Sequence, residues 1–244
     1  MSQNAALEAQ SYQGIIIKKT PYRDTDLILG LFTKEVGKVS VFVPGARKSI
    51  KRFGPYLDFF AEISMMVQVQ SKKALWRLKE TDLISSHMEL RKNLSVLGFA
   101  TYYADCLWNL LADLDPHPHI YEHFQKVLNF EVTPSNRFQS MFEFESKLLE
   151  MTGYELKFQT CMTCNTPTQS SMFFSYPQGS VLCMSCKVRE PGHHISGQTW
   201  GCMQKQCDWD LSSYVEIREV MSGFVEYTLG KSLKSHGFRK SINA

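Results

Sequence analysis

The sequence lacks the short motifs that mark several common classes of enzyme. It contains no Gly-x-Ser-x-Gly nucleophile elbow and no His-Glu-x-x-His metal motif. The stretch 30–38 resembles a P-loop, but its spacing is wrong and Val39 stands where a P-loop has Ser or Thr. Glu143 and Glu145 would point about 200° apart on a helix, so they do not converge as a catalytic pair. We therefore expect a protein that works by binding and is not an enzyme.

The chain also lacks a long apolar segment free of polar residues. Its first ten residues are polar and include Glu8, which is unlike a secretory signal. The most apolar run, 96–114, contains Asp105, Asn109 and Asp113, which favours a buried helix over a membrane span. The seven cysteines are an odd number, so they cannot all pair as disulfides. These features predict a protein of the reducing cytoplasm that does not bind membranes.

Charge is unevenly distributed along the 244 residues, although the net charge is only +3. Residues 1–80 hold 13 Lys+Arg against 7 Asp+Glu, whereas residues 81–160 hold 6 against 11 and residues 161–244 hold 8 against 6. A basic N-terminal part indicates a polyanionic partner for that part of the chain.

The hydrophobic pattern changes from a strand period to a helical period near residue 83. Five strands are expected at 14–19, 27–33, 39–43, 59–70 and 74–79. Five strands in about 70 residues suggest a small barrel. Helices are expected at 88–93, 94–113, 120–129, 135–152 and 212–233. The prediction is an α+β chain with a flexible tail at 1–11, a barrel domain at 12–82 and a helical domain at 83–244.

Two Cys-x-x-Cys pairs give the most specific chemical signal. The pairs are Cys161 with Cys164 and Cys183 with Cys186, and the spacer 165–182 has the length expected for a four-thiolate zinc site. Strand-like residues on either side of a Pro-Gln-Gly turn predict a ribbon hairpin, within a zinc module at about 158–190. Four thiolates leave no open position on the ion, so the predicted Zn²⁺ is structural. Two disulfides or four ordinary thiols are the alternatives.

Other residues offer further options for metal binding. His193 or His194 could replace one of the four cysteines, and Cys202 with Cys207 could form an additional thiol pair. Three more histidines have a metal-like spacing, but the prolines beside them favour a surface turn at a helix entrance. They are His117, His119 and His123.

The candidate nucleic-acid contacts are basic residues of the β-rich part. The longest loop, 47–52, carries four cations and is followed by Phe53, whose ring could stack on a base. A solvated loop is the alternative reading. A second basic group lies at 72–79, where Trp76 fits a core position better than a stacking platform. Arg23 could equally pair with a neighbouring aspartate. The predicted DNA contacts are Lys18, Lys19, Arg23, Arg47, Lys48, Lys51, Arg52, Phe53, Lys72, Lys73 and Arg77.

Several short sequences follow one another in a characteristic order. They are Gly14-Ile15-Ile16-Ile17-Lys18, Tyr22-Arg23-Asp24-Thr25-Asp26-Leu27-Ile28, Gly45-Ala46-Arg47-Lys48, Phe144-Glu145, Gly153-Tyr154 and the two cysteine pairs. In this order the chain resembles the RecO family of recombination-mediator proteins over nearly its whole length. It departs from the family at Pro44 and Asn165, where Lys and Gly are frequent. Asn tolerates the left-handed backbone that a cysteine knuckle requires.

The resemblance implies a fold and a function. It implies that the barrel is an OB-fold, that the helical domain carries the zinc module, and that the protein binds and anneals single-stranded DNA during recombinational repair. It also implies loading of a recombinase onto strands covered by single-stranded-DNA-binding protein, with that protein, RecR and single- and double-stranded DNA as partners at the nucleoid. A zinc-stapled regulator that reads a specific duplex site remains the alternative. A metal-dependent hydrolase would need an open metal position, which four cysteines do not leave.

Overall fold

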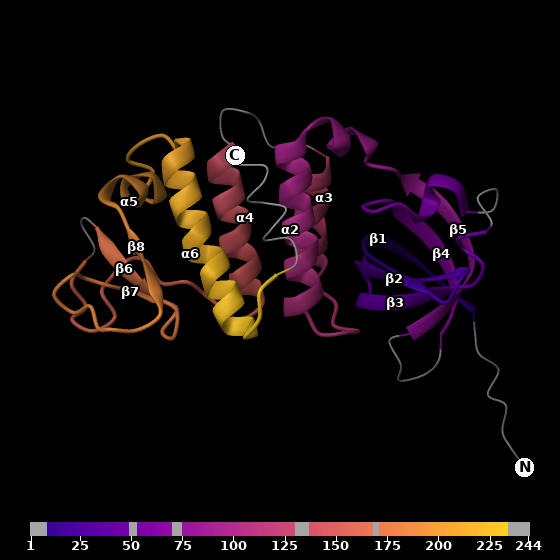
Figure 1. Cartoon of the computed structure of the whole chain (residues 1–244), viewed down its shortest axis with the longest axis horizontal. Helices are drawn as coiled ribbons and strands as arrows, with labels where there is room; N and C mark the ends of the chain where they lie inside the picture. The colour runs from indigo at the N-terminus through magenta and orange to yellow at the C-terminus, as the bar shows by residue number, and fades with distance from the viewer. Residues whose placement is uncertain (1–8, 49–52, 70–74, 130–136, 168–170, 234–244) are drawn as a thin grey trace, which may run out of the picture. The chain divides into compact units, whose positions relative to one another are not determined.

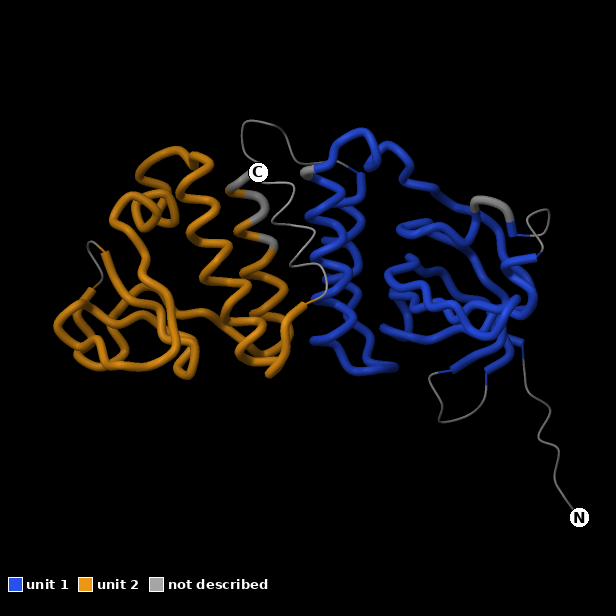
Figure 2. The backbone as a smooth tube through the Cα atoms, in the orientation of Figure 1, with its two compact units in different colours: residues 1–131, 234–244 blue, residues 132–233 orange. Residues whose placement is uncertain are grey.

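The computed structural model describes residues 9–48, 53–69, 75–129, 137–167 and 171–233 (Figure 1). The chain divides into two compact units, which we call unit 1 (1–131 with 234–244) and unit 2 (132–233) (Figure 2). Over the described ranges, the helices are too short or too polar to cross a lipid bilayer.

A closed five-stranded barrel forms the first part of unit 1 (Figure 1). Its strands are β1 (Ala9–Tyr22), β2 (Asp26–Thr33), β3 (Gly37–Val43), β4 (Glu62–Gln68) and β5 (Leu75–Ser85). They follow the order β1-β2-β3-β5-β4 around the barrel. The five predicted strands are therefore confirmed, and the N-terminal domain of the chain has the predicted OB-type barrel fold.

The barrel closes because β1 is long enough to pair with two neighbouring strands. Its first half pairs antiparallel with β4 and its second half with β2, with a register shift between Ile16 and Lys18. Such a shift bends a strand and lets it continue around a small barrel. Strand β5 completes the circle because it pairs parallel with β3 and antiparallel with β4. The sequence pattern had predicted only the middle of β1 and the first half of β5.

The barrel interior is filled by the apolar members of an alternating pattern. In β3, Val39, Val41 and Val43 are fully buried, whereas Ser40 and Phe42 between them are partly exposed. Successive side chains of a strand point to opposite faces, which explains this alternation. The same core contains Trp76, which is 3% exposed and stacks on Tyr12 with ring centroids 4.9 Å apart. The assignment of Trp76 to the core is confirmed.

The 3₁₀ turns η1 (Gly54–Leu57) and η2 (Met88–Lys92) and the helices α2 (Leu94–Leu110) and α3 (Pro118–Leu128) complete unit 1. Trp108 of α2 lies directly on Gly30 of β2, where an added Cβ would come within 2.3 Å of the indole ring. The ammonium of Lys38 donates hydrogen bonds of 2.7 Å to the carbonyls of Trp108 and Leu111. A cation is favourable at these last carbonyls of a helix. These contacts hold α2 against the barrel.

The described residues of unit 2 form helices and a small sheet (Figure 1). The helices are α4 (Arg137–Met151), α5 (Gly197–Met203) and α6 (Leu211–Leu229). The strands are β6 (Met172–Ser175), β7 (Ser180–Leu182) and β8 (Gly192–Ile195), in the order β7-β6-β8. The predicted hairpin is β6 with β7. Strand β8 and helix α5 were not predicted, because each is too short to show a clear period.

Candidate nucleic-acid interface and metal centre

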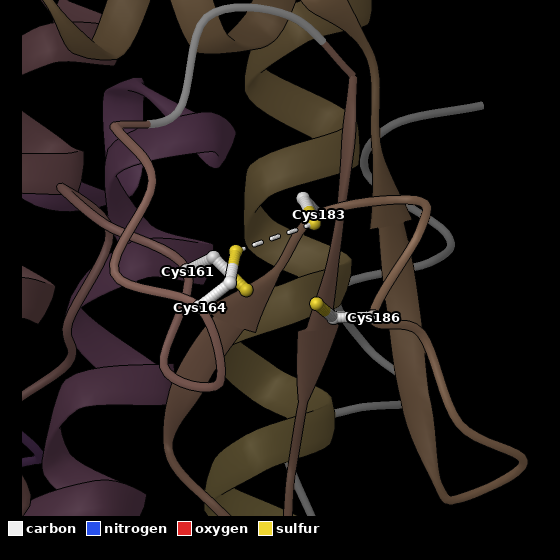
Figure 3. Close-up of side chains that lie close together, drawn as sticks. All are labelled: Cys161, Cys164, Cys183 and Cys186. Atoms are coloured by element: carbon white, nitrogen blue, oxygen red, sulfur yellow. Dashed lines mark hydrogen bonds between the residues drawn. The ribbon is translucent and has the colours of Figure 1, made fainter.

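The four cysteines of the two Cys-x-x-Cys pairs converge in unit 2 (Figure 3). Their sulfur atoms all lie within 4.8 Å of one another, and Cys164 Sγ and Cys183 Sγ are 3.9 Å apart. Zn–S bonds of about 2.3 Å put the corners of a tetrahedron about 3.8 Å apart. The arrangement therefore fits a tetrahedral, soft divalent ion, and the group could hold a metal.

The backbone of the first knuckle is arranged around the sulfur of Cys161. Asn165 has a φ of 56°, and its N–H donates to the carbonyl of Cys161 at 2.9 Å. The asparagine thus takes the left-handed conformation expected of it. Burial alone would raise the pKa of the Cys161 thiol, but N–H groups of Cys183, Cys164 and Thr163 directed at its sulfur lower that pKa to about 6. These donors favour the thiolate, which is the form that binds metals.

The metal group is attached to the sheet of unit 2 through apolar contacts. Cys161 is fully buried and packs with Phe173 of β6 and Leu182 of β7. The N–H of Met162 donates to the carbonyl of Val181 at 3.0 Å, which ties the first knuckle to β7. The first knuckle is therefore tied to the β6–β7 hairpin by a core contact and by a backbone hydrogen bond.

A basic and aromatic surface lies at one end of the barrel, where the β1–β2 turn meets the segment after β3 and the beginning of β5. Arg77 of β5 stands beside Phe42 of β3 in the sheet, and its guanidinium lies 5.8 Å from the Phe42 ring centre. The Tyr22 ring meets Phe42 edge to face at 5.9 Å, and the Arg23 guanidinium lies 5.2 Å from the Tyr22 ring. We call this surface the basic–aromatic cluster. It consists of Tyr22, Arg23, Phe42, Arg47, Lys48 and Arg77.

Asp26 fixes the loop that supplies Arg47 and Lys48 to the cluster. Its carboxylate accepts hydrogen bonds from the Gly45 N–H at 2.8 Å and from the Thr25 hydroxyl at 2.9 Å. The Arg47 N–H in turn donates to the Thr25 carbonyl at 2.9 Å. The Gly45 N–H, helped by Thr25 and the nearby arginines, holds the pKa of Asp26 below its usual value. The carboxylate is therefore charged at neutral pH and holds this loop against the β1–β2 turn.

Two members of the cluster were not predicted from the sequence. Tyr22 is 40% exposed and Phe42 is partly exposed, so their rings are accessible beside the guanidinium groups of Arg23 and Arg77. Phe42 sits at an outward position of β3, between inward-facing valines, which is the signal that could have identified it.

The prediction that Phe53 contacts DNA requires a correction. Its ring is 4% exposed and packs in the hydrophobic core of the barrel. It offers no free face to a base.

The remaining predicted DNA contacts lie outside the cluster. Lys18 faces α2, with its ammonium 4.2 Å from the Trp108 ring centre, and Lys19 is paired with Asp58 at 3.6 Å. Adjacent residues of a strand point to opposite faces, which separates these two lysines. Four further predicted contacts fall outside the described residues: Lys51, Arg52, Lys72 and Lys73.

The alternative metal ligands are separate from the cysteine group. His193 Nε2 lies 3.8 Å from a carboxylate oxygen of Glu219, and His117 Nε2 lies 3.0 Å from Asp115 Oδ2 at the start of α3. Among the residues that the structure describes, the four cysteines form the one cluster with metal-binding geometry.

Comparison with known proteins finds two models of one protein family that together match nearly the whole chain. The family model described as "Recombination protein O N terminal" matches residues 8–87, and "Recombination protein O C terminal" matches residues 91–237. The chain is 27% identical to the DNA repair protein RecO of Anaeromyxobacter sp. (strain K) over 241 residues, covering 94% of this chain and 95% of that one. It is 25% identical to the protein of that name from Myxococcus xanthus (strain DK1622), covering 97% and 99% respectively.

Proposed function

The chain belongs to the RecO family of DNA repair proteins, and on this premise we propose that it is a recombination mediator. It binds single-stranded DNA, anneals complementary strands, and helps a recombinase to replace single-stranded-DNA-binding protein. RecR and the single-stranded-DNA-binding protein are its protein partners in this proposal, and duplex DNA is a product that it contacts. Its work is done by binding, with no bond made or broken by the chain.

The basic–aromatic cluster is the observation that carries the proposal. It places the cations of Arg23 and Arg77 beside two accessible rings, next to the loop that carries Arg47. Proteins that bind single strands without sequence preference combine cations along the phosphate backbone with aromatic faces for the bases. The cluster supplies both at the end of an OB-type barrel, a fold whose loops and open face bind oligonucleotides.

Annealing follows from how such a surface holds a strand. Cations that neutralise phosphates reduce the repulsion between two backbones, and rings that stack on bases keep the strand extended and unpaired. A second strand can then pair with the free base edges. Lys19, Lys51, Arg52, Lys72 and Lys73 stay further DNA contacts in our proposal, whereas Lys18 faces Trp108 of α2 and lies outside this path.

We also propose that the four-cysteine group holds a structural Zn²⁺. Thiolate ligands suit zinc, and four of them fill its coordination sphere. Bound there, the ion would link the two knuckles and stabilise the sheet of unit 2. The barrel would then carry DNA, while the zinc-bearing helical part would serve as a scaffold for partners.

The proposal is tested by annealing strands that are coated with single-stranded-DNA-binding protein. The protein should accelerate annealing of complementary coated strands of any sequence, and RecR should change its action on them. A preference for one duplex sequence in competition would instead favour the sequence-specific regulator. Failure to anneal either bare or coated strands would contradict the mediator assignment.

Replacement of Tyr22 by Ala should weaken single-strand binding by about 5- to 150-fold, which corresponds to the loss of one base stack of about 1–3 kcal/mol. No charge is removed, so the slope of affinity against salt should stay the same. Fluorescence anisotropy over a range of salt concentrations measures both quantities. Tyr22→Phe is the matched control, because it keeps the ring and should retain affinity. An equal loss in Tyr22→Phe would show that the ring is not a stacking platform.

A further inference from the structure

Two cysteines outside the metal group lie in contact at the end of helix α5. The sulfurs of Cys202 and Cys207 are 2.8 Å apart, closer than the separation between the neighbouring sulfurs Cys164 and Cys183 in the metal group. Two sulfurs bound to one zinc ion would be about 3.8 Å apart. The pair is therefore arranged for a direct bond between its sulfurs rather than for sharing a metal.

The backbone at the end of α5 brings the two cysteines together. The chain reverses at Lys205, whose φ is 58°, and the N–H groups of Gln206 and Lys205 donate to the carbonyls of Gly201 and Cys202 at 2.9 and 3.0 Å. This is the Schellman hydrogen-bond pattern, which turns a chain back along the last turn of its helix. Gly201 lies beside the pair, since a Cβ added there would lie 3.4 Å from Cys207 Sγ.

The two thiols differ sharply in exposure. Cys202 is 1% exposed, whereas Cys207 is exposed beside a pocket of about 310 Å³ that Lys205 and Trp209 also line. A small molecule can reach the Cys207 sulfur through this pocket. Cys202 lines the same pocket, but it is almost completely buried. One thiol is thus placed to react first and the other to complete the reaction.

From this arrangement we infer that Cys202 and Cys207 form a reversible disulfide by exchange with a low-molecular-weight disulfide. The Cys207 thiolate attacks one sulfur of the small disulfide and releases one small thiolate. The Cys202 thiol then loses its proton to solvent and attacks the Cys207 sulfur, which releases the second small thiol. Two protein thiols are oxidised and one small disulfide is reduced to two thiols. The resulting bridge closes a loop of six residues, 202–207.

The bridge would join α5 to the segment that begins α6. Asp210, three residues after Cys207, is the N-cap of α6, where it accepts from the Ser213 N–H at 2.7 Å, and Gln198 of α5 donates to the same carboxyl group at 2.6 Å. Oxidation would fix a connection that these hydrogen bonds already make. Because a crosslink restricts the unfolded chain, the melting temperature of unit 2 should be higher in the oxidised protein.

The inference is tested on the full-length, metal-loaded protein with oxidised glutathione as the probe. After alkylation of the remaining thiols, trypsin cuts behind Lys205, so a bridge is detected as fragment 190–205 joined to fragment 206–218. This joined pair should appear at lower oxidant ratios than any loss of metal, and reduced glutathione should reverse it. Oxidation of the metal-group cysteines first, or a stable glutathione adduct on Cys207 of the unaltered protein, would overturn the inference.

Two variants separate the roles of the thiols. Cys202→Ser should stop at the glutathione adduct on Cys207, since nothing can displace it. Cys207→Ser, a change at an exposed position that should leave folding intact, should leave Cys202 almost unmodified, because only 1% of its surface is exposed. Modification of Cys202 in Cys207→Ser at the rate seen for Cys207 in the unaltered protein would contradict the assigned order of attack.

Discussion

Removal of the four cations of the basic–aromatic cluster should reduce single-strand affinity several-hundred-fold at about 0.1 M salt. The variant replaces Arg23, Arg47, Lys48 and Arg77 by glutamine. Each phosphate contact contributes about −0.7 to the slope of log affinity against log salt, so the slope should become shallower by about three. Annealing should fall with affinity, because both depend on neutralised backbones. Anisotropy titrations at several salt concentrations measure the affinity and the slope together.

A matched control removes the same number of charges elsewhere on the chain. The control residues belong to none of the barrel strands and are exposed or partly exposed; they are Lys92 of η2, Lys126 of α3, Lys147 of α4 and Lys231 after α6. Their replacement by glutamine changes the net charge equally but should leave the slope nearly unchanged. If the two quadruple variants lose the same affinity, binding depends on total charge and the cluster is not the site. Unchanged affinity in the cluster variant would exclude the cluster from DNA binding.

Cys161→Ser should prevent stable folding of unit 2. Structural zinc sites in small peptides bind with about 10–16 kcal/mol at neutral pH, which matches or exceeds the whole stability of a typical domain, about 5–15 kcal/mol. Cys161 is the fully buried member of the group and packs on the sheet, so its loss removes a ligand and a core contact. Metal analysis should show less than one ion per chain, and calorimetry should lose the unfolding transition of unit 2.

The control for this change is Cys207→Ser, which removes an exposed thiol of the same unit but leaves the four ligands intact. It should retain one metal ion per chain and the transition of unit 2. The barrel transition should persist in both variants, because the cysteine group lies outside unit 1. A Cys161→Ser protein that folds normally and keeps its metal would contradict a structural role. Normal folding with loss of a reaction would point to catalysis at the metal.

Local patterns predicted most of the fold. Alternation such as Val39-Ser40-Val41 indicates a strand with one buried face, and this signal needs no knowledge of neighbouring strands. The spacing of Cys161, Cys164, Cys183 and Cys186 likewise predicts a group that could hold a metal, because each knuckle is formed within a few residues. Strand pairing at the ends of β1 and β5 was not predicted, since those residues become strands only through distant partners.

The sequence by itself determined the barrel strands, the cysteine group and the uneven charge of the chain, because each arises from residues that are near one another in the sequence. Only the tertiary structure decided which charges and rings share a surface. It directed the side chains of Lys18 and Lys19 to different partners and placed Phe53 in the core. It also brought Tyr22, Phe42 and Arg77 together in the cluster. The physical reason is that barrel closure and the register between strands set these contacts, and both depend on pairing between segments tens of residues apart.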